Sequence, residues 1–351
     1  MFLKIIIMRK SIFLIFLCTA SYSCQERAEY VGLLFPKTVT LQGEVCNDDF
    51  FFNRPQALFI KDSLLILYDD NHDGIIHIFC NTGKYILSAV NRGRGPGEVI
   101  TPCSIDLMDN KILICSPNLN RLIVYDLHKI IKGSTPYHTD EYSLFNNSDR
   151  IQQAKWYKNG SIAVKSYSKN MRFGFIDGEI AVSTYWSYPN LVPDQEENRS
   201  IWEYFSHWKF KPDYSKMVTT TYIGSLMEIF NSDSITDIKS EKLLPIHKPK
   251  YTLAKGAIPK WVTSSDDTTI GFQDLFVTDD HIYALIYGVN INDLEANLPS
   301  IYVLSWDGTP KVNYRFKERI CTFCVDEQER NIYAIVYDDD GNLSLRRYSI
   351  L

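Results

Sequence analysis

The chain has 351 residues, of which 45% are hydrophobic and 13% aromatic, and its net charge is −5. This length and composition allow a large core in one big domain or two ordinary ones. The acidic balance argues against nucleic acid as a partner, because nucleic-acid-binding proteins need basic surfaces.

Residues 1–23 form a predicted secretory signal with a basic head and a short apolar run. The uncharged stretch Ser11–Ser23 is shorter than the roughly 20 residues that a membrane-spanning helix needs. A small residue then precedes Cys24, as in the bacterial lipobox, whose cysteine is acylated and becomes the mature N-terminus. We therefore predict a lipoprotein with its lipid on Cys24, followed by a linker at 24–34. An ordinary signal cleaved nearby is the alternative.

One pattern then recurs from Gln56 to the end: an apolar strand, a polar turn, a β-branched or aromatic strand, a second turn and an alternating strand. The copies are about 50 residues apart, the period of propeller blades. Their equivalent turn positions are Ser63, Lys111, Gly160, Ser215, His281 and Asn331. Each copy predicts a small antiparallel sheet whose apolar faces are buried when the sheets close into a ring.

The six copies predict an all-β fold, a six-bladed β-propeller over residues 35–351. The last copy ends after about three strands, which is one fewer than a full blade. We therefore expect the N-terminal stretch Phe35–Val45 to supply the missing outer strand and close the ring. A β-sandwich would also contain many short strands, but it would not give this period.

The glycine-rich stretch "NRGRGPGEVITP", Asn91–Pro102, separates the first two copies. It is no phosphate-binding loop, since Gly-Lys-Ser/Thr does not follow and the next element is a strand. It resembles the blade junction of NHL-type propellers, G-x-G-P-G-x-(F/V)-x-x-P, where glycines allow positive φ and close backbone approach. Arg92, Arg94 and Glu98 are candidate ligand contacts near the channel mouth. A purely structural turn is the alternative.

Two long connections interrupt the repeat, at 186–204 and 245–272, and we expect a short helix after Pro193 in the first. Long connections in a repeat protein are where function is usually carried. Trp202 and Trp261 within them are candidates for stacking on a sugar or a peptide, with core packing as the alternative.

Residues 24–351 as a whole resemble the TolB-like six-bladed propeller lipoproteins common in Bacteroidetes. The resemblance rests on the lipobox, "NRGRGPGEV", "VTDDHIYALIYG" and "FKPDYSKMV". In the last of these, Tyr214 stands where the S-P-D-G-x-K hairpin of TolB blades normally has glycine. The resemblance implies a location in the cell envelope, at the outer membrane, with attachment through the lipid alone. It carries over no catalytic residues.

The stretch "DDNHDG" places Asp69, Asn71 and Asp73 at the spacing of a calcium loop. Cys80 occupies the position of the expected glutamate, and a tight hairpin turn is the alternative explanation. Six further cysteines follow Cys24, and an exported protein can oxidise them, but the sequence does not give their pairing.

The function predicted from these features is that of a binding module for an envelope protein, a peptide or a glycan. We expect neither chemistry nor a cofactor of its own. The alternative is a propeller hydrolase or lyase with a channel-mouth site assisted by calcium. A cluster of His, Glu and Asp in the channel would favour the enzyme, whereas an aromatic or polar channel face would favour binding.

Overall fold

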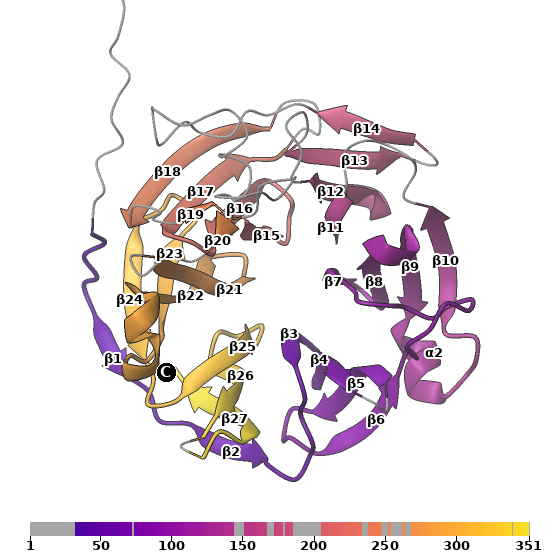
Figure 1. The fold of residues 1–351 in the computed structure, drawn as a ribbon, viewed down its shortest axis with the longest axis horizontal. Coiled ribbons are helices and arrows are strands. Elements are labelled where there is room, and N and C mark those ends of the chain that lie inside the picture. Colours follow the sequence, from indigo (N-terminus) through magenta and orange to yellow (C-terminus); the bar gives the residue numbers. More distant parts are fainter. Residues whose placement is uncertain are drawn as a thin grey trace, which may run out of the picture.

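The computed structural model shows a ring of β-sheets around a central axis (Figure 1). It describes residues 32–71, 74–143, 151–166, 172–177, 180–184, 205–233, 238–247, 252–253, 262–263, 268–338 and 340–350. The predicted signal at 1–23, the lipid site Cys24 and the helix expected after Pro193 lie outside these residues. In the described part, no helix is both long and apolar enough to span a membrane.

Six antiparallel blades follow one another along the chain, and each begins with its innermost strand. Blade 1 contains β3 (Pro55–Lys61), β4 (Leu64–Asn71), β5 (Gly74–Cys80) and β6 (Tyr85–Ala89). Blade 2 contains β7 (Ser104–Met108), β8 (Lys111–Ser116), β9 (Arg121–Asp126) and β10 (His138–Ser143). Blade 3 contains β11 (Ile151–Trp156), β12 (Ile162–Ser166), β13 (Phe173–Asp177) and β14 (Ile180–Thr184).

The remaining blades complete the ring. Blade 4 contains β15 (Ser206–Phe210), β16 (Lys216–Thr221), β17 (Ser225–Asn231) and β18 (Lys239–His247). Blade 5 contains β21 (Thr269–Val277), β22 (His281–Asn290), β23 (Ser300–Ser305) and β24 (Pro310–Arg315). Blade 6 contains β25 (Arg319–Val325), β26 (Asn331–Tyr337) and β27 (Leu343–Ser349). The predicted six-bladed propeller is therefore confirmed.

Short elements connect the strands. They are η1 (Pro117–Leu119), α2 (Leu127–Lys132), η2 (Lys158–Gly160), η3 (Ile291–Ala296) and the hairpin of β19 (Thr252–Leu253) with β20 (Val262–Thr263). Helix α2 begins where the Asp126 carboxylate accepts the Lys129 N–H at 3.1 Å, and it ends at Gly133, whose φ is 65°. Between β15 and β16, Tyr214 adopts a φ of 59°, the conformation that glycine supplies in the TolB-type hairpin.

The N-terminal segment closes the ring, as predicted, but it does so with two strands rather than one. Strand β2 (Glu44–Asn47) pairs antiparallel with β27 and is the missing outer strand of blade 6. Strand β1 (Thr38–Thr40), the earlier part of the predicted stretch, pairs in parallel with β24 and adds a fifth strand to blade 5. Figure 1 shows this segment running around the outside of both blades. We call Thr38–Asn47 the clasp.

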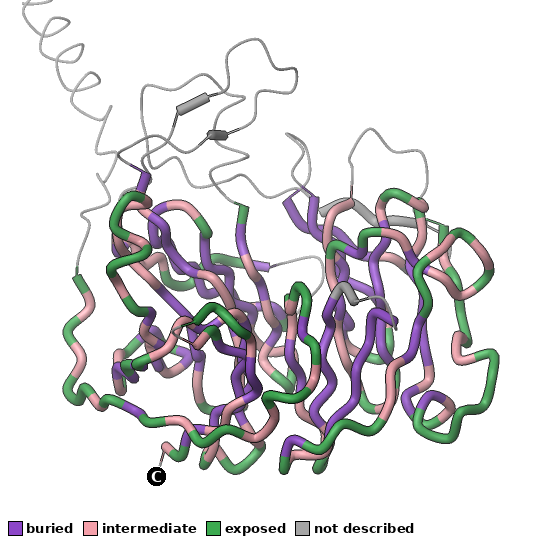
Figure 2. The backbone as a smooth tube through the Cα atoms, turned by 60° about the horizontal axis from the view of Figure 1, so that its bottom comes forward, coloured by how far each residue is buried: buried purple, intermediate pink, exposed green. Residues whose placement is uncertain are grey.

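The hydrophobic core lies between the blades. The buried apolar side chains of the described residues form six clusters, and each cluster joins two neighbouring blades. The cluster between blades 1 and 2, for example, packs Ile66 and Ile76 against Ile112 and Ile123. Figure 2 shows the buried residues concentrated along the strands. Ring closure therefore buries both faces of every blade, which a single blade cannot do for itself.

The interface between blades 3 and 4 also contains buried charges. Arg172 donates to Glu228 at 2.8 Å, and both side chains are almost completely buried. The Lys165 ammonium donates to the Ser206 carbonyl at 3.0 Å, and burial holds the pKa of Lys165 well below its usual value. Buried charges require such partners, because an uncompensated charge away from water is strongly destabilising.

Candidate functional site

The inner strands of the blades place their side chains around a central channel. The described residues line two cavities in this channel, with volumes of about 430 Å³ and about 220 Å³. The larger one, which we call the mouth chamber, lies toward the C-terminal ends of the inner strands and includes Met108 and Tyr214 in its lining. The smaller one, the lower chamber, lies toward their N-terminal ends and is lined by residues such as Ser104 and Ser206.

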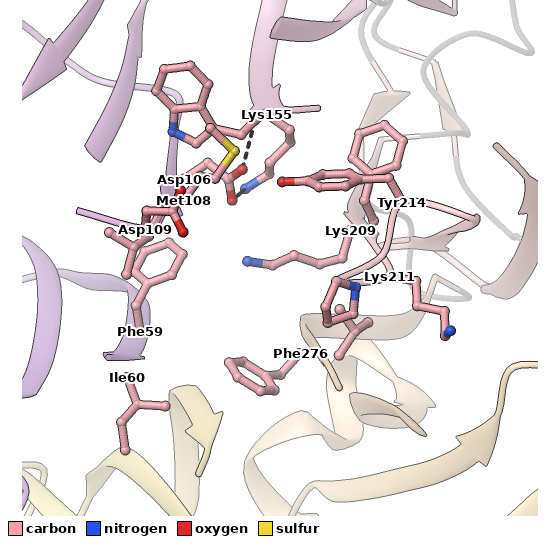
Figure 3. Close-up of a pocket in the computed structure, with 15 residues that line it drawn as sticks. Phe59, Ile60, Asp106, Met108, Asp109, Lys155, Lys209, Lys211, Tyr214 and Phe276 are labelled. Atoms are coloured by element: carbon pink, nitrogen blue, oxygen red, sulfur yellow. Dashed lines mark hydrogen bonds and ion pairs between the residues drawn. The ribbon is translucent and has the colours of Figure 1, made fainter. Parts of the chain in front are cut away.

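Three residues, Phe59, Lys155 and Lys209, line both chambers. Phe59 comes from blade 1 and Lys209 from blade 4, which face each other across the six-membered ring. The Lys209 ammonium lies 4.8 Å from the centre of the Phe59 ring, as a cation–π contact (Figure 3). This contact crosses the channel and separates the two chambers.

Lys155, the second channel lysine, is fully engaged. Its ammonium donates to the Ile105 carbonyl at 2.8 Å and to the Asp106 carboxylate at 3.3 Å. The other Asp106 oxygen accepts the Trp156 N–H at 2.9 Å. These contacts connect the inner strands of blades 2 and 3. The charge of Lys155 is thereby neutralised by Asp106 within the protein.

Asp274 on β21 plays the corresponding part between blades 5 and 6. Its carboxylate accepts the Thr322 hydroxyl at 2.7 Å and the Phe323 N–H at 3.1 Å, and its other oxygen accepts the Leu275 N–H at 2.8 Å. Burial raises the pKa of Asp274, and these hydrogen bonds oppose that rise. The carboxylate is therefore satisfied without Lys209.

Lys209 differs from these charged neighbours, because its ammonium makes no hydrogen bond or ion pair with any residue that the structure describes. Burial and the nearby Lys155 lower the pKa of Lys209 to about 8, although Asp106 and Asp274 oppose the shift. Burial and the channel lysines also lower the pKa of His207 to about 3, so this histidine is neutral at pH 7. Among the described residues that line the channel, Lys209 thus has the one unpaired ammonium group, which is suited to bind an anion.

The walls of the mouth chamber are mainly apolar. Those walls come from Phe59, Ile60, Leu107, Met108, Trp156, Phe210, Pro212, Tyr214, Phe276 and Val277. Figure 3 shows Lys209 extending between these walls with Phe276 on one side and the Lys155–Asp106 pair on the other. A cavity of this size with apolar walls and few polar groups has the usual character of a ligand-binding pocket.

The predicted contacts Arg92, Arg94 and Glu98 lie outside both chambers. Their loop runs from β6 to β7 and ends beside the lower chamber. The Glu98 carboxylate folds back to accept the Gly95 N–H at 2.8 Å, so it stabilises its own loop. The structural role of the turn is thus visible, and ligand contact by these three residues remains a prediction.

The glycines of this loop do not share one role. The loop has a left-handed backbone at Gly97, with φ of 67°, where an added Cβ would lie 2.3 Å from the His138 ring. At Gly93 and Gly95 the backbone is not left-handed, and the close neighbour is the end of the flexible Glu98 side chain. Gly97 is therefore the residue on which this crossing depends most.

The candidate calcium ligands are only partly described. Asp69 is completely buried, and its carboxylate accepts the N–H groups of Asn53 at 2.8 Å and of Arg54. Asn71 ends β4, and Asp73 lies outside the described residues, as do Trp202 and Trp261. Among the residues that are described, no three His, Cys, Asp or Glu side chains are grouped to hold a metal ion. The six described cysteines are free thiols.

Sequence reasoning missed Phe59, Lys155 and Lys209. They belong to no motif and come from three different blades, so only the ring brings them together. One signal was present, since "AKW" and "WKF" place a lysine between apolar residues within inner strands. A charged residue at such a position in a predicted propeller indicates a side chain that faces the channel.

Comparison with known proteins agrees with this architecture. The sequence model described as TolB-like 6-blade propeller-like matches residues 34–328. The chain therefore belongs to the TolB-like six-bladed propeller family, as its sequence motifs suggested. No curated protein matches it significantly.

Solved structures show the same fold. A Bacteroides fragilis protein inferred to be exported is 11% identical, with a TM-score of 0.53, over 88% of this chain and 94% of its own. A member of the DUF4221 family from Bacteroides vulgatus is 13% identical, with a TM-score of 0.58, over 88% and 97%. The WD40 repeats of RRP9 are 6% identical, with a TM-score of 0.51, over 88% and 99%. At these identities the similarity extends to the fold and not to a ligand.

Proposed function

We propose that this protein is a lipid-anchored binding module of the cell envelope, and that a protein, peptide or glycan enters its mouth chamber. One observation carries the proposal: Lys209 holds an ammonium group in the channel without a hydrogen-bond or ion-pair partner among the described residues. Lys209 is half-buried in the lining of both chambers, and an ionisable group with a shifted pKa in a cleft is a candidate ligand contact.

The envelope location is supported by two independent observations. The sequence has a basic head, a short apolar run and the Ser23–Cys24 junction of a lipobox. The fold is shared with a Bacteroides protein inferred to be exported. In this proposal the lipid on Cys24 holds the propeller at the outer membrane, and the clasp joins that anchor to blades 5 and 6.

Binding is favoured over catalysis by the make-up of the described channel. Its charged and titratable groups include the engaged Lys155 and Asp106, the satisfied Asp274, the neutral His207, Lys211 paired with Asp213, the carboxylate of Asp109 and the unpaired Lys209. General acid–base work needs a donor and an acceptor that converge on one reacting atom. Aromatic and aliphatic walls around one cation instead match the needs of recognition.

Site-specific photo-crosslinking in cells that make the protein tests the proposal. A photoreactive phenylalanine analogue at Phe276, in the wall of the mouth chamber, should form a defined adduct with an envelope component. The same analogue at Ile86, which is 43% exposed on the outer strand of blade 1, is the matched control. Identical adducts from both positions, or none from Phe276, would show that the chamber is not the binding site.

A further inference from the structure

We infer that the group recognised in the mouth chamber is a peptide carboxylate beside an apolar side chain, and that Lys209 binds it. The inference rests on the proposed function and names its ligand class. It follows from three properties of the described chamber: the number of unpaired charges, the nature of the walls and the weakness of the contact that Lys209 makes now.

The unpaired charge favours a monoanion. Five charged residues line the mouth chamber: Asp106, Asp109, Lys155, Lys209 and Lys211. Lys155 is paired with Asp106 at 3.3 Å, and Lys211 is paired with Asp213 at the rim at 2.5 Å. Among the described residues, Lys209 is the one ammonium of this lining without an ion-pair partner, and Asp109 is the one carboxylate without such a partner, so Asp109 would repel a second negative charge on the ligand. A carboxylate fits this balance better than a phosphate dianion.

The walls favour a peptide over an acidic sugar. Each sugar hydroxyl needs a hydrogen-bond partner when it leaves water, and an unsatisfied one is costly. Most charged side chains of the lining are already paired, Lys155 with Asp106 and Lys211 with Asp213, so few groups remain for sugar hydroxyls. The aromatic and aliphatic side chains of the walls instead match a leucine or phenylalanine side chain. A peptide that carries an apolar residue next to its carboxylate would use both the walls and the cation.

A carboxylate can replace the cation–π contact of Lys209 with a stronger interaction. The Phe59 ring lies 4.8 Å from the ammonium and offers only the attraction of its π face. A carboxylate would form a charge-assisted hydrogen bond instead, and such a bond is worth about tenfold to a hundredfold in affinity. The ligand would also raise the pKa of Lys209, because an anion stabilises the charged form.

Calorimetric titration with defined probes tests the inference. N-acetyl-Phe-Leu with a free carboxyl terminus and N-acetyl-Phe-Glu-Leu-amide present the carboxylate from a chain end and from a side chain. N-acetyl-Phe-Leu-amide, glucuronate and phenyl phosphate are the comparisons. We expect at least one carboxylate peptide to bind about tenfold or more tightly than the amide, the sugar acid and the phosphate. Which of the two binds identifies the source of the carboxylate.

Variants assign the effect to one side chain. Lys209→Gln should remove the preference for carboxylate over amide, and Lys209→Arg should restore most of it. Lys132→Gln, on the exposed surface of α2, is the matched control, and the thermal midpoint of each variant confirms that it is folded.

Several results would overturn the inference: no saturable binding of either carboxylate peptide, equal binding of carboxylate and amide, tighter binding of glucuronate or phenyl phosphate, or a preference that survives Lys209→Gln. The crosslinking experiment at Phe276 separates this failure from a failure of the proposed function. An adduct there that the carboxylate peptides do not compete away would keep the chamber as a binding site and reject the carboxylate.

Discussion

Replacing Gly271 with alanine should weaken the junction between blades 4 and 5. The N–H of Gly271 donates to the Tyr222 carbonyl at 2.7 Å, and the N–H of Gly224 donates to the Thr269 carbonyl at 2.8 Å. A Cβ added at Gly271 would lie 1.6 Å from the Gly224 carbonyl oxygen. Because the obstacle is backbone, the two segments must move apart by about 2 Å to reach a normal contact distance.

The expected cost combines two effects. Separation breaks both backbone hydrogen bonds, each worth about 1 kcal/mol, and overpacking adds about 1 to 3 kcal/mol. Gly271→Ala should therefore lower the free energy of unfolding by about 3 to 5 kcal/mol. In urea denaturation, with a slope near 3 kcal/mol per molar, the midpoint should fall by about 1 M or more.

Gly133→Ala provides the comparison. Gly133 has a φ of 65°, and an added Cβ there would have no atom within 4 Å. Alanine at this position is therefore disfavoured only by its left-handed backbone conformation, which costs about 1 kcal/mol. The two variants thus separate steric exclusion from backbone conformation. If Gly271→Ala were no more destabilising than Gly133→Ala, the close approach of the two blades at this point would be wrong.

Three further predictions concern the anchor, the clasp and the channel. Metabolic labelling with a clickable fatty acid should mark the wild-type protein and not Cys24→Ala, and equal labelling of both would reject the lipid site. Deletion of 35–47 should lower the thermal midpoint of the whole propeller in a single transition, since it exposes sheet edges on blades 5 and 6; an unchanged midpoint would contradict the closure. The pKa of Lys209 is lowered from 10.5 to about 8, so between these values the unfolded chain binds more protons than the folded one. The free energy of unfolding of the wild type, measured relative to Lys209→Met, should therefore rise with pH from about 8 to 10.5, and a flat or falling difference would mean that the ammonium is not desolvated.

The blades could be predicted from the sequence because each one is a local unit. The hairpins from Ser63 to Asn331 lie within single copies of the repeat. The alternation of apolar and polar residues along their strands indicates which face of each strand is buried. The closing strand was also predictable, since the last copy lacks one and an open ring exposes its edges. The parallel pairing of β1 was not, because Thr38–Thr40 is only three residues long and its partner β24 lies far along the chain.

The candidate site was beyond sequence reasoning for a geometric reason. The lysine between apolar residues in "WKF" indicates that Lys209 faces the channel, but the sequence does not show which residues lie opposite it. Its contact with Phe59 depends on which blades lie opposite each other. The glycine loop illustrates a similar limit, because three glycines in five residues predict a tight crossing without showing that the left-handed position is Gly97 and not Gly95.

The clasp has a consequence for how the protein is made. Glu44 in β2 forms an ion pair with Arg347, which lies 303 residues later in the chain. During synthesis and export, β2 emerges long before its partner β27. It therefore stays unpaired while the first five blades form. Strand β1 can pair with β24 once blade 5 has formed, but β2 has no partner until blade 6 forms and presents an open edge to other chains. Pairing of β2 with β27 is thus the last folding event, and a product that ends before β27 would keep the edge of β2 open for proteases and for aggregation.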